Sequence, residues 1–335
     1  MGKSLTSFML RLIVAVALIW LFVGSARLLE ACRLLIRCRP APILASFAIM
    51  VLGILVKTVK WQVFLGAEGI HMGYWRLFRY YMASCFFNVF LPSSVGGDVK
   101  RMFDVALDTQ RRAASVGSIL ADRGTGMYVL IVYCVFVTLW RWSKIGGWYV
   151  SGPILLLTGG ITVGVPVALL AFHRIHPWLA GRGRLSDQLL RVLQSVVVQV
   201  RHPLGMAAGL SLSFVFLLLT ILQVWYLAQA LSITVPWEAL FVSVPMVFGL
   251  ASLPITINGI GIREGGFIYF LGLYGIAPES AVAVSLGILA LLIALGLLGG
   301  MIFLASPSSF RKMPKEPAKS DRSKMRPSHG ATGAV

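Results

Sequence analysis

Charged residues set within apolar stretches are the features of this sequence that could do chemistry. Three groups occur: Asp98 with Arg101, Asp122 with Arg123, and Arg263 with Glu264. A charge near the centre of a bilayer costs about 2.5–3.5 kcal/mol on an insertion scale, so such residues usually mark substrate or ion pathways. Guanidinium groups suit a phosphate or another anionic headgroup, while the carboxylates could hold the arginines or carry protons. The three groups therefore predict a binding or transport site.

The composition indicates an all-α integral membrane protein. Of the 335 residues, 58% are hydrophobic and only 13% are charged, whereas a soluble domain carries about 25% charge. Apolar runs predict a polytopic bundle of about 7–9 segments. The expected segments are 8–26, 42–60, 76–95, 114–140, 150–172, 204–231, 238–258, 263–276 and 280–304. We interpret the first as a retained span because it contains Arg11 and lacks a clear cleavage site.

Two segments are expected to be broken or re-entrant. The stretch 86–101, FFNVFLPSSVGGDVKR, runs from an apolar helix into a Pro/Gly break and then charged residues. Pro92 removes a backbone donor, and Gly96 and Gly97 permit backbone conformations closed to other residues. Asn88 could bond the freed backbone groups, and Asp98 would lie near the start of a new helix, where the helix dipole favours an anion.

The stretch 253–264, LPITINGIGIRE, follows the same order of Leu-Pro, glycines and charges. Asn258, Gly259 and Gly261 predict a tight polar turn before Arg263 and Glu264. Such distant similarity suggests an inverted repeat, whose substrate sites lie at discontinuous helices. We therefore expect the two broken segments to meet in one polar site, with Asp122 and Arg123 nearby.

Each charged group also has a purely structural interpretation. The 86–101 stretch could be a helix end with snorkelling bases, and the Arg263–Glu264 pair could simply neutralise itself. Asp122 and Arg123 lie deep enough in their expected helix that both should face the bundle interior, but such pairs in helices are often purely structural. Lys60-Trp61 and the bases Arg76 and Arg79 are expected to anchor the bilayer interface.

The net charge of +18 favours an anionic lipid surface over nucleic acid, because the bases lie between apolar runs and in the tail. Regions 99–112, 173–201 and 306–335 are basic and are expected on the cytoplasmic side. The basic stretch 27–39 would also lie on the cytoplasmic side only if segment 76–95 crosses the membrane fully. The side of the membrane on which the N-terminus lies therefore stays open. Residues 306–335 predict a disordered tail after a membrane domain, 1–305. With no phosphate-binding loop, HExxH or paired CxxC motif, no cofactor or metal is expected.

Together these motifs resemble the flippase-like family, also called the lysylphosphatidylglycerol synthase transmembrane region family. The resemblance covers about residues 8–305 and rests on the ordered motifs of 88–101, 122–126 and 254–264. It implies a protein of the bacterial inner membrane that moves lipids or lipid-linked compounds between leaflets. Two-domain relatives add a cytosolic aminoacyl-transferase domain, which this chain lacks, so enzymatic activity is not expected.

The resulting hypothesis is a translocator of an anionic or phosphate-bearing lipid. Arg101, Arg123 and Arg263 would contact the headgroup, and Asp98, Asp122 and Glu264 would hold those arginines or couple transport to protons. Two other classes stay open. One is a scaffold or accessory subunit of a lipid-modifying enzyme or glycosyltransferase, and the other is a membrane-embedded transferase.

Overall fold

Every regular element in the part of the chain that the structure describes is a helix. The computed structural model describes residues 24–90, 96–142, 201–252 and 259–306, with a few positions between 152 and 199. The helices are α2 (Gly24–Ile36), α3 (Pro40–Ala67), α4 (Tyr74–Phe90), α5 (Gly96–Thr109), α6 (Arg112–Trp140), α9 (Pro203–Ala230), α10 (Trp237–Ala251), α11 (Ile262–Gly272) and α12 (Pro278–Ala305). The expected span 150–172 and tail 306–335 lie almost entirely outside the described residues, as does most of span 8–26.

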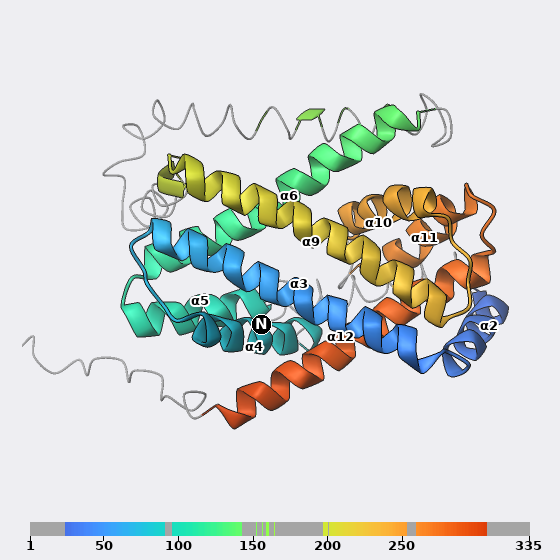
Figure 1. Ribbon diagram of the computed structural model, residues 1–335, viewed down its shortest axis with the longest axis horizontal. Coiled ribbons are helices and arrows are strands. Elements are labelled where there is room, and N and C mark those ends of the chain that lie inside the picture. The colour runs from blue at the N-terminus through green and yellow to red at the C-terminus, as the bar shows by residue number, and fades with distance from the viewer. Residues whose placement is uncertain are drawn as a thin grey trace, which may run out of the picture.

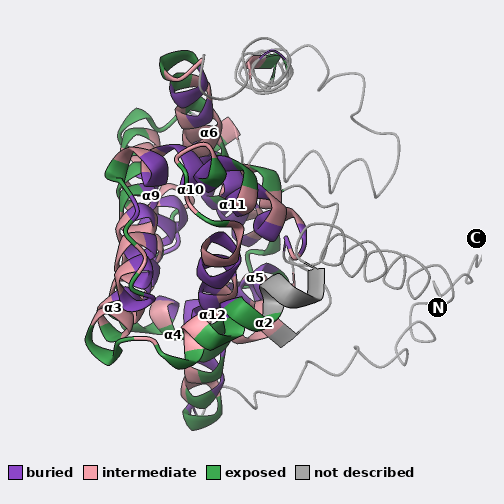
Figure 2. Ribbon diagram, turned by 90° about the vertical axis from the view of Figure 1, so that its right-hand side faces the viewer, coloured by how far each residue is buried: buried purple, intermediate pink, exposed green. Residues whose placement is uncertain are grey.

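Four of these helices are long and apolar enough to cross a membrane: α3, α6, α9 and α12, with 28 or 29 residues each. At 1.5 Å per residue such a helix is about 42 Å long, which matches a bilayer with its headgroups. Large apolar side chains remain exposed on their outer faces, for example Leu44, Phe136 and Met301, while buried residues line the inward faces (Figure 2). The protein is therefore a polytopic helical membrane protein, as expected.

The remaining helices of the bundle are too short to cross alone. Helices α4 and α5 have 17 and 14 residues, and α10 and α11 have 15 and 11. Each pair packs as a helical hairpin. The sequence leaves open whether segments 76–95 and 263–276 cross fully, and α4 and α11, which cover much of them, are shorter than the about 20 residues that a crossing needs. Most of the basic region 99–112 lies within α5, which buries Arg101.

The order of long and short helices occurs twice. Helices α3 to α6 read long, short, short, long, and α9 to α12 repeat that order. The packing is reciprocal, since α4 of the first half packs against α12 while α10 of the second half packs against α6. Asp98 and Glu264 are each the third residue of their helix, α5 and α11. These correspondences identify two structural repeats.

The repeats meet along α3 and α9, which run side by side in opposite directions (Figure 1). The Arg39 backbone N–H donates to the Ala230 carbonyl at 2.8 Å, and the Ser46 hydroxyl donates to the Gln223 carbonyl at 2.9 Å. Seven residues forward on one helix thus match seven residues back on the other. A two-fold axis that exchanges antiparallel spanning helices lies in the membrane plane, so the repeat is inverted.

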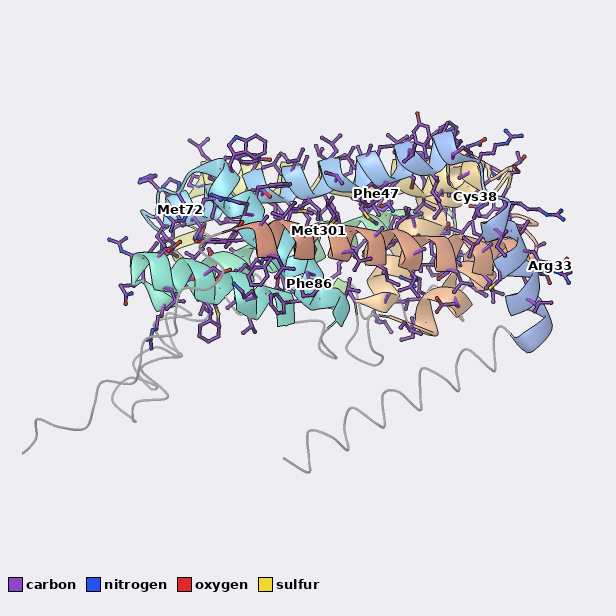
Figure 3. The ribbon with its side chains drawn as sticks, turned by 90° about the horizontal axis from the view of Figure 1, so that it is seen from below. Arg33, Cys38, Phe47, Met72, Phe86 and Met301 are labelled. Carbon is purple, nitrogen blue, oxygen red and sulfur yellow. The ribbon has the colours of Figure 1, made fainter. Side chains whose placement is uncertain are left out.

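Glycines bring α4 close to both of its main neighbours. A Cβ atom at Gly299 of α12 would lie 2.1 Å from the Met82 carbonyl oxygen of α4. A Cβ atom at Gly97 of α5 would lie 2.1 Å from the Ser84 carbonyl oxygen. Phe86 of α4 lies beside the C-terminal part of α12, where Met301 is labelled (Figure 3). The approach at Gly97 places the start of α5, and with it Asp98 and Arg101, directly against α4.

Candidate functional site

The charged residues of the first half converge on Asp122 of α6. The Lys60 ammonium of α3 lies 2.9 Å from Asp122 Oδ1, and it also donates to the Asp122 carbonyl at 2.7 Å. Arg101 Nη2 of α5 donates to Asp122 Oδ2 at 2.8 Å. All three residues are at most 3% exposed. One carboxylate therefore ties three helices together.

Arg101 connects this carboxylate to the start of α5. Its Nε and Nη2 atoms each lie 2.9 Å from Asp98 Oδ1, three residues earlier. Its guanidinium lies 5.0 Å from the Trp61 ring centroid and 4.6 Å from that of Tyr81, in the range of cation–π contacts. The predicted Asp98–Arg101 pairing is present, and the arginine is wedged between aromatic rings.

Arg123 differs from its neighbour Asp122. Its Nε forms an ion pair with Asp98 Oδ2, yet 43% of its side chain is exposed. The expectation that both residues face the interior thus holds for Asp122 and is wrong for Arg123. We call Lys60, Asp98, Arg101, Asp122 and Arg123 the cationic cluster, because three bases face two acids.

The helix interruption lies next to this cluster. Asn88, in the last turn of α4, accepts a hydrogen bond from the Gly97 backbone N–H at 2.9 Å, which is the backbone bonding expected of it. Gly96 and Gly97 open α5, and Asp98 lies in its first turn. Pro92 lies outside the described residues. The α4–α5 hairpin therefore holds Asp98 and Arg101 in place.

The second half holds a separate group of polar side chains. Ser285 of α12 donates to Glu264 Oε1 at 2.7 Å and accepts from Arg263 Nε at 2.9 Å. Arg263 Nη2 lies 3.4 Å from Glu264 Oε1, and Glu264 Oε2 accepts from the Gly261 backbone N–H at 2.5 Å. We call Arg263, Glu264 and Ser285 the neutral cluster, because it holds one base and one acid.

The neutral cluster fixes the turn before α11. Gly259 and Gly261 have φ angles of 73° and 88°, a region that glycine adopts without strain. This confirms the tight turn predicted there. Asn258 lies outside the described residues. The self-neutralising interpretation of the Arg263–Glu264 pair fits this geometry, with Ser285 as a third member that the sequence did not reveal.

Ser285→Ala is expected to destabilise the protein by about 1–3 kcal/mol, because Arg263 Nε and Glu264 Oε1 would each lose a buried partner. The measurement is the thermal unfolding midpoint in detergent. Ser243→Ala is a matched control, since Ser243 is also fully buried but donates only to the Ala239 carbonyl of its own helix. Equal midpoint shifts for both variants would contradict a structural role for Ser285.

The expectation of one shared polar site is wrong for the described residues. Helices α5 and α11 make no contact with each other, and no ion pair or hydrogen bond among the described residues joins the two clusters. In Figure 1, α5 and α11 lie toward opposite ends of the α3–α9 pair. The inverted repeat explains this, because it places equivalent segments on opposite sides of its axis.

The sequence interpretation also misplaced Lys60 and Trp61. Both were expected at the interface, but Lys60 is 3% exposed and Trp61 is fully buried. The expected span ended at Lys60, whereas α3 continues to Ala67. A lysine within a 28-residue apolar helix is itself a signal of an intramembrane site. Arg76 does lie near the surface, 2.7 Å from Asp108 of α5.

The clusters differ in what they can do. The described residues contain no group of three or more His, Cys, Asp or Glu side chains arranged to hold a metal. The neutral cluster satisfies its own charges. The cationic cluster has one base in excess and reaches the surface through Arg123, so its residues are suited to holding an anion.

Comparison with known proteins agrees with this membrane architecture. The family model described as the lysylphosphatidylglycerol synthase TM region matches residues 8–300. The chain belongs to this family. A similar relative is a UPF0104 membrane protein of Methanothermobacter thermautotrophicus, 22% identical over 298 residues, which cover 81% of this chain and 86% of the relative. No solved structure matches the chain. The family match spans both repeats and therefore both clusters.

Proposed function

We propose that this protein moves a phosphate-bearing or otherwise anionic lipid, or a lipid-linked intermediate, between the two leaflets. The observation that carries the proposal is the cationic cluster, in which Lys60, Arg101 and Arg123 face Asp98 and Asp122 inside a membrane bundle. An excess of positive charge is costly in lipid and is offset when an anion enters.

The depth of the cluster supports transport over simple surface binding. Asp122 lies ten residues from the start of α6, or about 15 Å along the helix. A bilayer is about 40–45 Å thick with its headgroups and about 30 Å without them. A headgroup that reached Asp122 and Arg101 would therefore have left the interface for the hydrocarbon region.

The inverted repeat supports the same function. Transporters built from inverted repeats place their substrate sites at interrupted helices and move one repeat against the other. Here the interrupted α4–α5 hairpin supplies Asp98 and Arg101, while the antiparallel α3–α9 pair joins the halves. In this proposal Arg101 contacts the headgroup phosphate, and Asp98 and Asp122 keep the guanidinium in position.

The test uses full-length protein in vesicles that carry fluorescent phosphatidylglycerol. Dithionite bleaches label only in the outer leaflet. Labelled lipid that starts in the inner leaflet is therefore bleached only after it has been translocated. We expect the protein to accelerate this for phosphatidylglycerol more than for a labelled glucosyl diacylglycerol, which lacks phosphate. Rates equal to those of protein-free vesicles for both lipids would contradict the proposal and favour a scaffold.

A further inference from the structure

Lys57 of α3 is a base without a carboxylate partner. It lies one helical turn before Lys60 and is half-buried. Among the described residues, no acid lies within ion-pair distance of its ammonium. Instead the ammonium lies 5.6 Å from the Tyr81 ring centroid and 4.6 Å from that of Phe216. Aromatic faces attract a cation, but they do not neutralise its charge.

Arg101 has an unused donor in the same region. Its side chain is 2% exposed, and Nη1 is buried without a hydrogen-bond partner, although Nε and Nη2 are both paired. The guanidinium also lies 4.6 Å from the Tyr81 ring centroid. Lys57 and Arg101 therefore both lie against the Tyr81 ring, and among the described residues the Lys57 ammonium and Arg101 Nη1 each have hydrogen-bonding capacity that is not used. Leaving a buried donor unpaired is costly.

The charge balance gives the chemistry of the missing partner. Counting Lys57 with the cationic cluster places four bases against Asp98 and Asp122. The partner must be an anion with several acceptor oxygens, because both an ammonium and a guanidinium edge need acceptors. A phosphate group meets both requirements, and arginine suits its geometry.

We infer that Lys57 and Arg101 form a phosphate-binding site beside Tyr81. This inference rests on the proposed function, for which it assigns the point where the headgroup binds. Lys57 lies ten residues before the end of α3, about 15 Å along the helix. That depth favours a lipid phosphate over free phosphate, because the acyl chains can stay in the surrounding hydrocarbon while the headgroup enters.

The test measures how added ligand shifts the thermal unfolding midpoint of the full chain in detergent, with tryptophan fluorescence as the readout. The probes are short-chain phosphatidylglycerol, a glucosyl diacylglycerol of equal chain length, and inorganic phosphate. We expect phosphatidylglycerol to stabilise the wild type and Lys57→Arg. Lys57→Met should need about tenfold more lipid for the same shift, the loss expected for one charged hydrogen bond. Lys100→Met is the control, because Lys100 already pairs with Asp104.

The unliganded proteins separate this role from a structural one. If Lys57 awaits an anion, Lys57→Met without lipid should unfold at a higher temperature than the wild type, because an uncompensated charge has been removed. A lower midpoint together with unchanged lipid binding would overturn the site and make Lys57 an aromatic anchor. If inorganic phosphate stabilises the protein in a Lys57-dependent way and phosphatidylglycerol does not, the site binds phosphate, but a lipid is not its ligand.

Failure of the site and failure of the proposed function are distinguishable. If phosphatidylglycerol binding depends on Lys57 but the protein does not translocate labelled lipid, the site is supported and the proposed function is wrong. If Lys57→Met binds and translocates phosphatidylglycerol as well as the wild type does, the proposed site is wrong but the proposed function stands.

Discussion

Arg101→Met is expected to destabilise the protein by about 3–5 kcal/mol, the cost of removing one partner from a buried charge network. Arg101 is 1% exposed and bonds both Asp98 and Asp122. Without it, Asp122 keeps only Lys60 as a cationic partner, and Asp98 keeps the half-exposed Arg123. The measurement is the yield of monodisperse protein in mild detergent together with its unfolding midpoint.

A second variant separates loss of charge balance from loss of packing. In Arg101→Met with Asp122→Asn, one base and one acid disappear together, and we expect most of the lost stability to return. If the double variant is as unstable as the single one, Arg101 stabilises the fold by packing between Trp61 and Tyr81. If the single variant unfolds at the wild-type temperature, the network contributes no stability.

Gly299→Ala is expected to separate α12 from α4. The new methyl group would lie 2.1 Å from the Met82 carbonyl oxygen, and backbone atoms cannot move aside as a side chain end can. Overpacking costs about 1–3 kcal/mol, and more where a helix must shift. A lower unfolding midpoint and a smaller folded fraction are the expected results.

Gly124→Ala is the matched control for Gly299→Ala. Gly124 lies inside α6, and an added Cβ meets nothing within 4 Å. Alanine in a helix interior is favoured over glycine by about 0.5–1 kcal/mol, so this variant should be unchanged or slightly more stable. Similar losses for both variants would contradict close packing of α4 on α12 as the cause.

The sequence predicted the parts of the fold that depend on local patterns. Apolar runs gave the spanning helices α3, α6, α9 and α12 approximately, and the Pro/Gly stretches predicted the interruptions after α4 and α10. The pairing of Asp98 with Arg101 was predictable because residues three apart share a helix face. These inferences need no knowledge of how the helices pack.

The sequence could not place contacts between helices. Asp122 binds Arg101, 21 positions earlier, and Lys60, 62 positions earlier, so their convergence depends on tertiary packing. The Lys60-Trp61 pair predicts an interface anchor, because tryptophan is enriched at headgroup depth. Nothing in the immediate sequence of Lys57 separates an unpaired lysine from a snorkelling one.

The repeated motif predicts one shared polar site, and this prediction differs most from the structure. Asp98 and Glu264 occupy equivalent positions in α5 and α11, yet each cluster has its own partners. A repeat relates its copies by an axis and does not bring them into contact unless they lie on that axis. Here α3 and α9 pack against each other directly, while α5 and α11 remain apart.

Transport through the cationic cluster is tested most directly by the initial rate at which labelled phosphatidylglycerol moves between leaflets in vesicles containing the folded double variant Arg101→Met with Asp122→Asn. The control is Lys100→Met with Asp104→Asn, which also removes one base and one acid from an ion pair, 2.5 Å apart on α5. Lipid transport through the cationic cluster predicts wild-type rates for the control and the rate of protein-free vesicles for the cluster variant. Wild-type translocation by the folded cluster variant would contradict it.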